Sequence, residues 1–369
     1  MKISILSMQK IDNFGSLLQA YSLQKLLKNN NQNIVKFIDI IKNEEDNKLI
    51  DCNPLDNKKA LKQKILKIVN KDFFIKVYLK PMVKKQTLEF EKFRNEILEI
   101  NQKDNEEEYD TCVIGSDEVF NCSIKSNWGF TSQLFGNVLN AKKVITYAAC
   151  CGITTTENIS KEVKEKIQES FKNISHFSVR DNNTYNFVKS LSNKKDITLS
   201  LDPVVVGDFD EEIVKYGKNV KLPKKYCIVY SYYNRINKKE DINAIKKFCK
   251  EQNMEIITIG APQLWNKNFI SMNPFEVLYA FSKADFVITD TFHGTIFSAK
   301  YAKKFAVLVQ DSNKFKLNDL ISRLQIEKHN IKNFKELEKA YKANNDLNSI
   351  KKIVEVERAK TIDYLNKSI

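Results

Sequence analysis

Residues 287–295 read Val-Ile-Thr-Asp-Thr-Phe-His-Gly-Thr. The apolar run 285–289 is typical of a buried strand, and the stretch 296–301 is typical of a helix. A strand, a loop and a helix start form the repeating unit of a parallel α/β sheet. Free backbone N–H groups at such a helix start favour an anion, and a histidine such as His293 can donate a proton. The stretch therefore predicts chemistry on a phosphorylated or carboxylated small molecule.

Strands of this kind recur and alternate with helices, which predicts two parallel sheets covered on both faces. We expect an α/β protein with one domain in residues 1–206 and a second in 226–330, and ligands where the carboxyl ends of the strands face each other. The polar stretch 207–225 indicates a linker, and 331–369 a helical tail. A helical insertion at about 57–101 is expected to break at Pro81. The expected strands are 3–7, 34–40, 111–115, 144–148, 177–179, 197–201, 226–232, 256–259, 286–289 and 305–309.

Charge, cysteine content and hydropathy argue against several classes of protein. The chain has 60 basic and 46 acidic residues and a net charge of +14, but no zinc-finger spacing or RNA-recognition signature, so we expect no nucleic-acid partner. Seven cysteines without regular spacing favour reduced thiols, and no pair has the spacing of a zinc site. No window is apolar enough to span a membrane, and the start is too short for a signal peptide, which predicts a cytoplasmic protein.

Two further strand ends carry polar side chains that can bind a sugar. Asn13 and Gly15 lie where the first strand turns into a helix, and Asn13 can bond a sugar hydroxyl or only its own loop. Ser116, Asp117 and Glu118 follow the strand 111–115, where two carboxylates can orient hydroxyl groups or accept a proton. A plain helix-capping turn would produce either pattern, so both interpretations stay open.

Arg180 follows the expected strand 177–179, and an arginine in this position can clamp a carboxylate or a phosphate. A local ion pair with Asp181 or with another carboxylate is the alternative. The other histidines, His176 and His329, lack a setting like that of His293, so His176, beside a strand, is expected to be structural.

Taken in order, these places resemble the polysaccharide pyruvyl transferase family, from the N-terminus to about Val309. Each motif is short, and it is their order and spacing that make the set specific. The lysine-rich insertion and the tail lie outside the resemblance. The matching segments are Asn13-Phe14-Gly15, Leu18-Gln19-Ala20-Tyr21, Gly115-Ser116-Asp117-Glu118, Tyr147-Ala148-Ala149, Ser178-Val179-Arg180-Asp181, Asp202-Pro203 and 289–295.

The resemblance implies two Rossmann-like domains similar to those of GT-B glycosyltransferases. It implies phosphoenolpyruvate as co-substrate without a cofactor, and a sugar of a cell-surface polysaccharide or glycolipid precursor as acceptor, with a pyruvate ketal as product. The implied catalytic residues are His293 as the acid, Arg180 and Asp117. The implied donor-binding residues are Arg180, Thr291, Phe292, His293, Gly294 and Thr295, and the acceptor-binding residues are Asn13, Phe14, Gly15, Ser116, Asp117 and Glu118.

The sequence departs from the family pattern at two places. Thr291-Phe292 stands where many members have Arg-Leu, as in a branch with Ser or Thr before Phe-His-Gly-Thr. Glu118 and Phe120 stand where many members have Gln and Trp. The loss of an arginine removes one bidentate clamp on the donor anion.

The implied reaction can be matched to the residues. Addition to the enol ether needs a proton on its methylene carbon, which His293 can supply. Arg180 and the N–H groups of Gly294 and Thr295 would hold carboxylate or phosphate, and Asp117 or Glu118 would accept a hydroxyl proton. No step requires a metal, and the sequence shows no metal cluster.

Two other functions remain compatible with the sequence. One is a glycosyltransferase that uses a nucleotide sugar, and the other is a non-catalytic glycan-binding relative. The stretch Lys58–Lys85 holds ten lysines and one acidic residue among apolar side chains. We expect it to rest on the anionic inner face of the membrane, where a lipid-linked acceptor would be, or to cover the first domain as a pair of helices.

Overall fold

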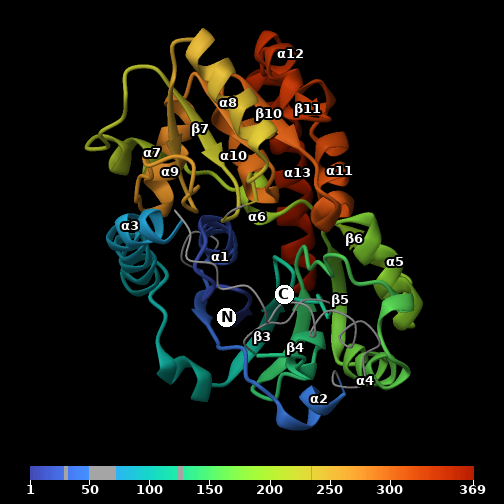
Figure 1. Ribbon diagram of the computed structural model, residues 1–369. Helices are drawn as coiled ribbons and strands as arrows, with labels where there is room; N and C mark the ends of the chain where they lie inside the picture. The colour runs from blue at the N-terminus through green and yellow to red at the C-terminus, as the bar shows by residue number, and fades with distance from the viewer. Residues whose placement is uncertain (29–31, 50–71, 123–127, 234) are drawn as a thin grey trace.

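The computed structural model describes residues 1–28, 32–49, 72–122, 128–233 and 235–369. The chain forms two α/β halves, each built on a parallel sheet with helices on its faces (Figure 1). The predicted pair of Rossmann-like domains is confirmed by this topology. The helices are α1 (Phe14–Lys28), α2 (Glu44–Lys48), α3 (Asp72–Lys92), α4 (Lys161–Phe171), α5 (Asn182–Leu191), α6 (Pro203–Val206), α7 (Asp210–Gly217), α8 (Lys239–Glu251), α9 (Pro274–Lys283), α10 (Phe292–Tyr301), α11 (Lys314–Arg323), α12 (Leu337–Lys342) and α13 (Leu347–Ser368).

The sheet of the N-terminal half has the order β2-β1-β3-β4-β5-β6, with every pair parallel. The order reverses between β1 and β3, and ligands of open α/β sheets bind outside the strand ends at such a switch point. The strands are β1 (Lys2–Leu6), β2 (Ile34–Phe37), β3 (Tyr109–Ile114), β4 (Ala141–Thr146), β5 (Ile174–Val179) and β6 (Ile197–Leu199).

The sheet of the C-terminal half has the order β11-β10-β9-β7-β8, again parallel throughout. Its switch point lies between β7 and β9, and the motif 289–295 follows β9. The strands are β7 (Tyr226–Tyr230), β8 (Glu255–Thr258), β9 (Phe286–Thr289), β10 (Phe305–Leu308) and β11 (Asn330–Ile331).

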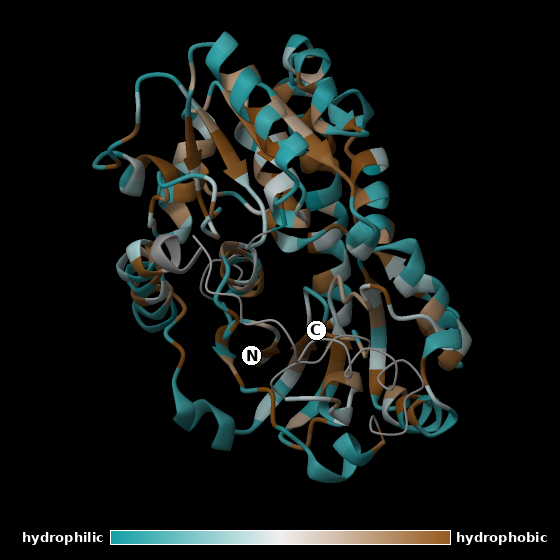
Figure 2. Ribbon diagram, in the orientation of Figure 1, coloured by the Kyte–Doolittle hydropathy of each residue, from teal (hydrophilic) through white to brown (hydrophobic). Residues whose placement is uncertain are grey.

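The two halves share one continuous apolar core. It joins the buried side of α1 to α6, α9 and α10, and the apolar strands of both sheets lie inside this packing (Figure 2). Figure 1 shows α13 running back from the C-terminal half to the N-terminal half, where Tyr364 donates a hydrogen bond to the carbonyl of Thr146 at 2.8 Å. The halves are therefore fixed to each other by packing as well as by the connecting chain.

Two predictions about elements were wrong. Helix α3 continues through Pro81, although we expected a break there, and the insertion before residue 72 lies outside the described residues. The stretch 207–225 is more than a linker because α7 forms within it. Three acidic residues in the first turn of α7 suit the helix dipole, and the Cα of Gly217 lies close to the ring of Tyr279 on α9.

Candidate active site

A cavity of about 360 Å³ lies between the two halves, at the switch points of both sheets. Ligands in two-domain α/β proteins bind in such a crevice. The N-terminal half contributes Met8, Ile11, Asn13, Ser16, Asp117, Glu118, Asn121 and Trp128, and the C-terminal half contributes Tyr232, Arg235, Phe292, His293, Ser312, Asn313 and Lys316.

The two walls of the cavity differ in charge. The wall of the N-terminal half carries the carboxylates Asp117 and Glu118, whereas the wall of the C-terminal half carries the cations Arg235 and Lys316. A molecule with an anionic end and a hydroxyl-rich end matches this division, because carboxylates accept bonds from hydroxyl groups and the cations attract anions.

His293 lies in the first turn of α10 and reaches toward the N-terminal half. Its Nε2 is 3.6 Å from Oδ2 of Asp202, which is longer than a hydrogen bond. The histidine side chain is 12% exposed and Asp202 is fully buried. Asp202 therefore lies behind the imidazole, at ion-pair distance from its Nε2.

Asp202 is the centre of a buried polar network. It accepts hydrogen bonds from Ser116 Oγ at 3.1 Å, from Arg180 Nη1 at 2.9 Å and from the N–H of Val204 at 3.0 Å. Burial by itself raises the pKa of Asp202, but His293 and Arg180 outweigh burial and lower that pKa below its ordinary value. Asp202 therefore remains a carboxylate beside His293.

Gly15 contacts the other side of the imidazole. A Cβ atom added to Gly15 would lie 2.1 Å from Nδ1 and 2.2 Å from Cγ of His293. Because Gly15 is buried at the start of α1, the absence of a side chain lets the N-terminal half approach the ring. From the sequence we expected Gly15 to allow a tight turn of the backbone. The structure shows in addition that Gly15 lies directly against the imidazole ring of His293.

Gly15→Ala is expected to displace the His293 ring or to separate the two halves. A shift of about 1 Å at a reacting group can cost about 10²-fold in rate, so turnover should fall by about that factor. The double variant Gly15→Ala/His293→Ala has room for the added methyl group. Thermal unfolding should therefore show a loss of stability from Gly15→Ala in the wild type and little loss in the His293→Ala background; equal losses would contradict the contact.

Thr291, Gly294 and Thr295 serve the helix and do not line the cavity. Thr291 is the N-cap of α10: its Oγ1 accepts the N–H of Gly294 at 3.0 Å, and its carbonyl accepts the N–H of Thr295 at 3.1 Å. The prediction that these two N–H groups hold an anion is wrong because both are already bonded. Within the described part of the chain, the N–H groups of Phe292 and His293 have no acceptor.

Arg180 also lies elsewhere than we expected. It is 2% exposed and sits behind the cavity wall, with the Phe292 ring 4.2 Å from its guanidinium carbon. Its partners are Asp202 and, at 3.8 Å, Asp117, rather than the neighbouring Asp181. Arg180 therefore pairs with the two carboxylates and does not itself line the cavity.

The acceptor residues that we predicted divide into two groups. Asn13, Asp117 and Glu118 line the cavity, whereas Phe14 is buried against Phe90 and Ser116 is buried against Asp202. Asp117 accepts a bond from Ser16 Oγ at 2.8 Å and has a left-handed backbone with φ of 74°. A non-glycine residue in this conformation is uncommon, and such strain gathers at functional sites.

Glu118 forms an ion pair with Lys316 across the cavity. Asn121 Nδ2 donates a second bond to Glu118 at 2.5 Å. Burial by itself raises the pKa of Glu118, but Lys316 outweighs burial and lowers the pKa to about 2. Glu118 is therefore a weak base, and its pair with Lys316 links the two halves.

The stability of the protein should depend on Glu118 in a pH-dependent way. The folded pKa lies below the ordinary value of 4.5, so the contribution is complete above about pH 4.5 and is lost as the pH falls toward 2. Glu118→Gln should lower the free energy of unfolding by about 1–3 kcal/mol at pH 6. Urea unfolding at several pH values checks this, with the exposed Glu165→Gln as control, and a difference that does not change with pH would contradict it.

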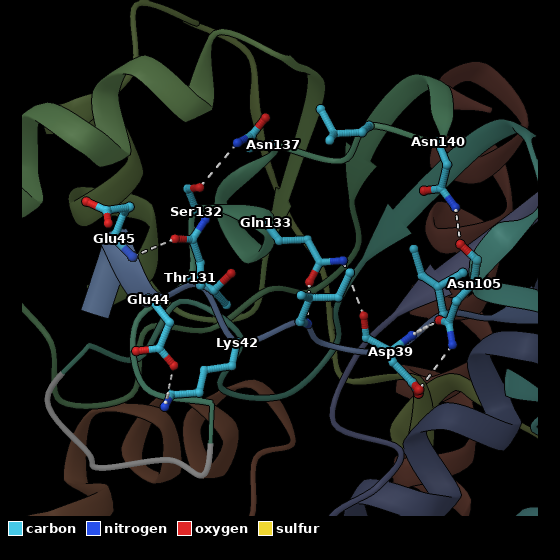
Figure 3. Close-up of a pocket in the computed structure, with 14 residues that line it drawn as sticks. Asp39, Lys42, Glu44, Glu45, Asn105, Thr131, Ser132, Gln133, Asn137 and Asn140 are labelled. Carbon is cyan, nitrogen blue, oxygen red and sulfur yellow. Dashed lines mark hydrogen bonds and ion pairs between the residues drawn. The ribbon is translucent and has the colours of Figure 1, made fainter. Parts of the chain in front are cut away.

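A larger cavity, of about 490 Å³, lies within the N-terminal half alone (Figure 3). Its amide side chains bond neighbouring backbone: Asn105 Oδ1 accepts the N–H of Asp39 at 2.7 Å, and Gln133 Oε1 accepts the N–H of Ile41 at 2.8 Å. These bonds hold the segment after β2 in place, so the two amide oxygens serve the fold. The smaller cavity contains His293, and we therefore assign the chemistry to it.

Sequence reasoning missed Ser16, Trp128, Tyr232, Arg235 and Lys316, and it named Asp202 only within the matching segment Asp202-Pro203, without a role. Polar residues that follow a strand were our candidates, and Arg235 follows β7. We missed it because the predicted strand 226–232 ends two residues later than β7 does.

Among the described residues, no group of three or more His, Cys, Asp or Glu side chains could hold a metal ion. No described helix is long and apolar enough to cross a membrane.

Comparison with solved structures finds similar chains that align along nearly the full length. One is a glycosyltransferase, SsfS6, from Streptomyces sp. SF2575, with 8% identity, a TM-score of 0.48, and coverage of 99% of this chain and 98% of that one. Another is the UDP-GlcNAc 2-epimerase of Methanocaldococcus jannaschii, with 12% identity, a TM-score of 0.47, and coverage of 96% and 99%. No curated protein matches the sequence.

The family comparison covers most of the chain and all of the site residues discussed above apart from Met8, Ile11, Asn313 and Lys316. The model of the polysaccharide pyruvyl transferase family matches residues 13–312. This chain therefore belongs to the polysaccharide pyruvyl transferase family and is a transferase.

Proposed function

We propose that this transferase moves the pyruvyl group of phosphoenolpyruvate onto a sugar of a cell-surface polysaccharide or glycolipid precursor. The observation that carries the proposal is His293, which lies between Gly15 and Asp202 at a cavity with one acidic and one basic wall. Phosphoenolpyruvate supplies the anionic end that the basic wall attracts, and a sugar supplies the hydroxyl groups that the acidic wall accepts.

The reaction balances with two sugar hydroxyl groups. His293 protonates the methylene carbon of phosphoenolpyruvate, and one sugar oxygen bonds to the carbon that carries phosphate. The second sugar oxygen then bonds to the same carbon while the C–O bond to phosphate breaks. One hydroxyl proton restores His293 and the other leaves with phosphate. The products are a cyclic pyruvate ketal and inorganic phosphate.

Asp117 is the better candidate to accept a hydroxyl proton from the sugar. It lines the cavity on the acceptor side, and Ser16 and the N–H of Glu118 hold its two oxygens. Glu118 is disfavoured because Lys316 lowers its pKa to about 2. Proton acceptance works best when the pKa of the base lies near the working pH.

The purified chain, phosphoenolpyruvate and a panel of glycolipid and oligosaccharide precursors test the proposal. Release of inorganic phosphate together with a ketal adduct in the mass spectrum is the expected result. A glycosyltransferase would instead be protected against unfolding by nucleotide sugars and not by phosphoenolpyruvate. A glycan-binding relative would bind the acceptor without turning over either donor, and each of these two results would reject the proposal.

We also propose that the stretch Lys58–Lys85 rests on an anionic membrane surface, close to a lipid-linked acceptor. Of this stretch, residues 58–71 lie outside the described residues, and the rest lies in α3. Its outer side exposes Val77 and Leu88 among Lys80, Lys84 and Lys85. Its inner side bonds the C-terminal half through Gln86, whose Nε2 donates to the carbonyl of Met272 at 2.8 Å. Apolar and basic side chains on one face suit the lipid interface. Flotation with anionic vesicles should carry the protein upward more than flotation with neutral vesicles, and equal or no binding rejects the idea.

A further inference from the structure

Arg235 has no role in the proton transfers described above. It lies in the segment after β7, beside β9, at the switch point of the sheet in the C-terminal half. Its Nη1 donates to the carbonyl of Asp290 at 3.2 Å, and its Nη2 donates to Ser312 Oγ at 3.1 Å. These bonds use two of the five N–H groups of a guanidinium. The side chain is 24% exposed and lines the cavity, so the remaining N–H groups can reach a ligand.

Two neighbours hold the guanidinium in this position. The Tyr232 ring centroid is 4.6 Å from the guanidinium carbon, and Asn313 Nδ2 donates to the same carbonyl of Asp290 at 2.7 Å. A stacked and doubly bonded arginine loses little conformational freedom when an anion binds, which favours binding.

Asp290 is the acidic neighbour of Arg235, and its side chain is buried. The Asp290 carboxylate is 3.5 Å from Nη1 and 1% exposed, and within the described part of the chain neither of its oxygens has a hydrogen-bond partner. Burial raises the pKa of Asp290 above its ordinary value, although the charge of Arg235 acts in the opposite direction. Asp290 does not line the cavity, whereas Arg235 does, so Arg235 is the group that an entering anion would meet.

Lys316 supplies a second cation on the same wall. Its partner is Glu118 of the opposite half, and an anion that enters the cavity would compete with this carboxylate for Lys316. A phosphate group carries about −1.5 to −2 charge near pH 7, whereas a carboxylate carries a single charge. Two cations on one wall match the more highly charged of the two groups.

We propose that Arg235 binds the phosphate group of the donor, with Lys316 as its second cation, at the carboxyl ends of β7 and β9. This inference rests on the proposed function. It places the phosphate on the wall of the C-terminal half, beside His293, and leaves the wall of Asp117 to the sugar. Arg235 acts by binding the phosphate group, and it does not transfer a proton.

Isothermal titration of the full chain with inorganic phosphate, pyruvate and phosphoenolpyruvate tests the assignment. Arg235→Ala should weaken binding of phosphate and phosphoenolpyruvate by about 10–100-fold, and leave pyruvate binding unchanged. Arg235→Lys should fall between wild type and alanine because lysine keeps the charge without the planar fork. Lys239→Ala removes the same charge from the exposed start of α8 and should bind all three molecules as the wild type does.

The outcomes separate this inference from the proposed function. If the chain releases phosphate from phosphoenolpyruvate while Arg235→Ala binds phosphate as tightly as wild type, the function stands and the assignment of Arg235 is overturned. If no turnover occurs but phosphate binding depends on Arg235, the function fails and the phosphate site stands. A wild-type chain that binds no phosphate at all also overturns the assignment.

Discussion

Replacing His293 with alanine is expected to lower phosphate release from phosphoenolpyruvate by about 10²–10⁴-fold, the usual contribution of a positioned general acid. Protonation of the methylene carbon is the step that makes the neighbouring carbon accept a sugar oxygen. His293 is the side chain placed for this step, because Gly15 and the carboxylate of Asp202 hold its ring at the cavity. A steady-state phosphate assay with a productive acceptor measures the loss.

The kinetic constants distinguish proton transfer from simple binding. If His293 donates the proton, kcat falls while the affinity for phosphoenolpyruvate, measured by titration, changes much less. His176→Ala makes the same change at an exposed position on β5, outside the cavity, and should leave turnover unchanged. A His293→Ala protein with wild-type turnover would remove His293 from the mechanism.

The order of strands and helices could be predicted because it follows from local patterns of apolar residues. The strand ends that carry Asn13, Asp117 and His293 were found in this way, and the cavity brings all three together. Parallel strands end at the same edge of a sheet, so polar residues that follow them are brought near each other without any knowledge of tertiary contacts.

The parts that could not be predicted depend on contacts between distant segments. Arg180 follows its strand as expected, but only the folded chain shows that it pairs with Asp202 and that the Phe292 ring packs over its guanidinium. Pro81 lies within α3 because proline does not always end a helix that tertiary packing supports. Lys316 lies outside every motif, and only the meeting of the two halves places it beside Glu118.

Asp202→Asn is expected to lower the free energy of unfolding by about 3–5 kcal/mol, the cost of removing one partner of a buried ion pair. Asp202 is fully buried, and its carboxylate is the nearest negative charge to the Arg180 guanidinium, at 2.9 Å. An amide keeps the shape of the side chain but leaves Asp117, at 3.8 Å, as the remaining ion-pair partner of the buried Arg180 among the described residues. Urea unfolding near pH 7 measures the effect.

Asp208→Asn provides the matched control because it makes the same change six residues later in the same connecting segment. The Asp208 side chain is 55% exposed and 3.8 Å from Arg358, so its loss should cost no more than about 1 kcal/mol. If Asp202 also orients His293, Asp202→Asn should slow turnover in the wild type but not in the His293→Ala background, because residues that act as a unit are not additive. Equal costs for Asp202→Asn and Asp208→Asn would show that the buried ion pair of Arg180 and Asp202 contributes no more to stability than an exposed pair does. Additive losses of turnover would show instead that Asp202 acts independently of the imidazole.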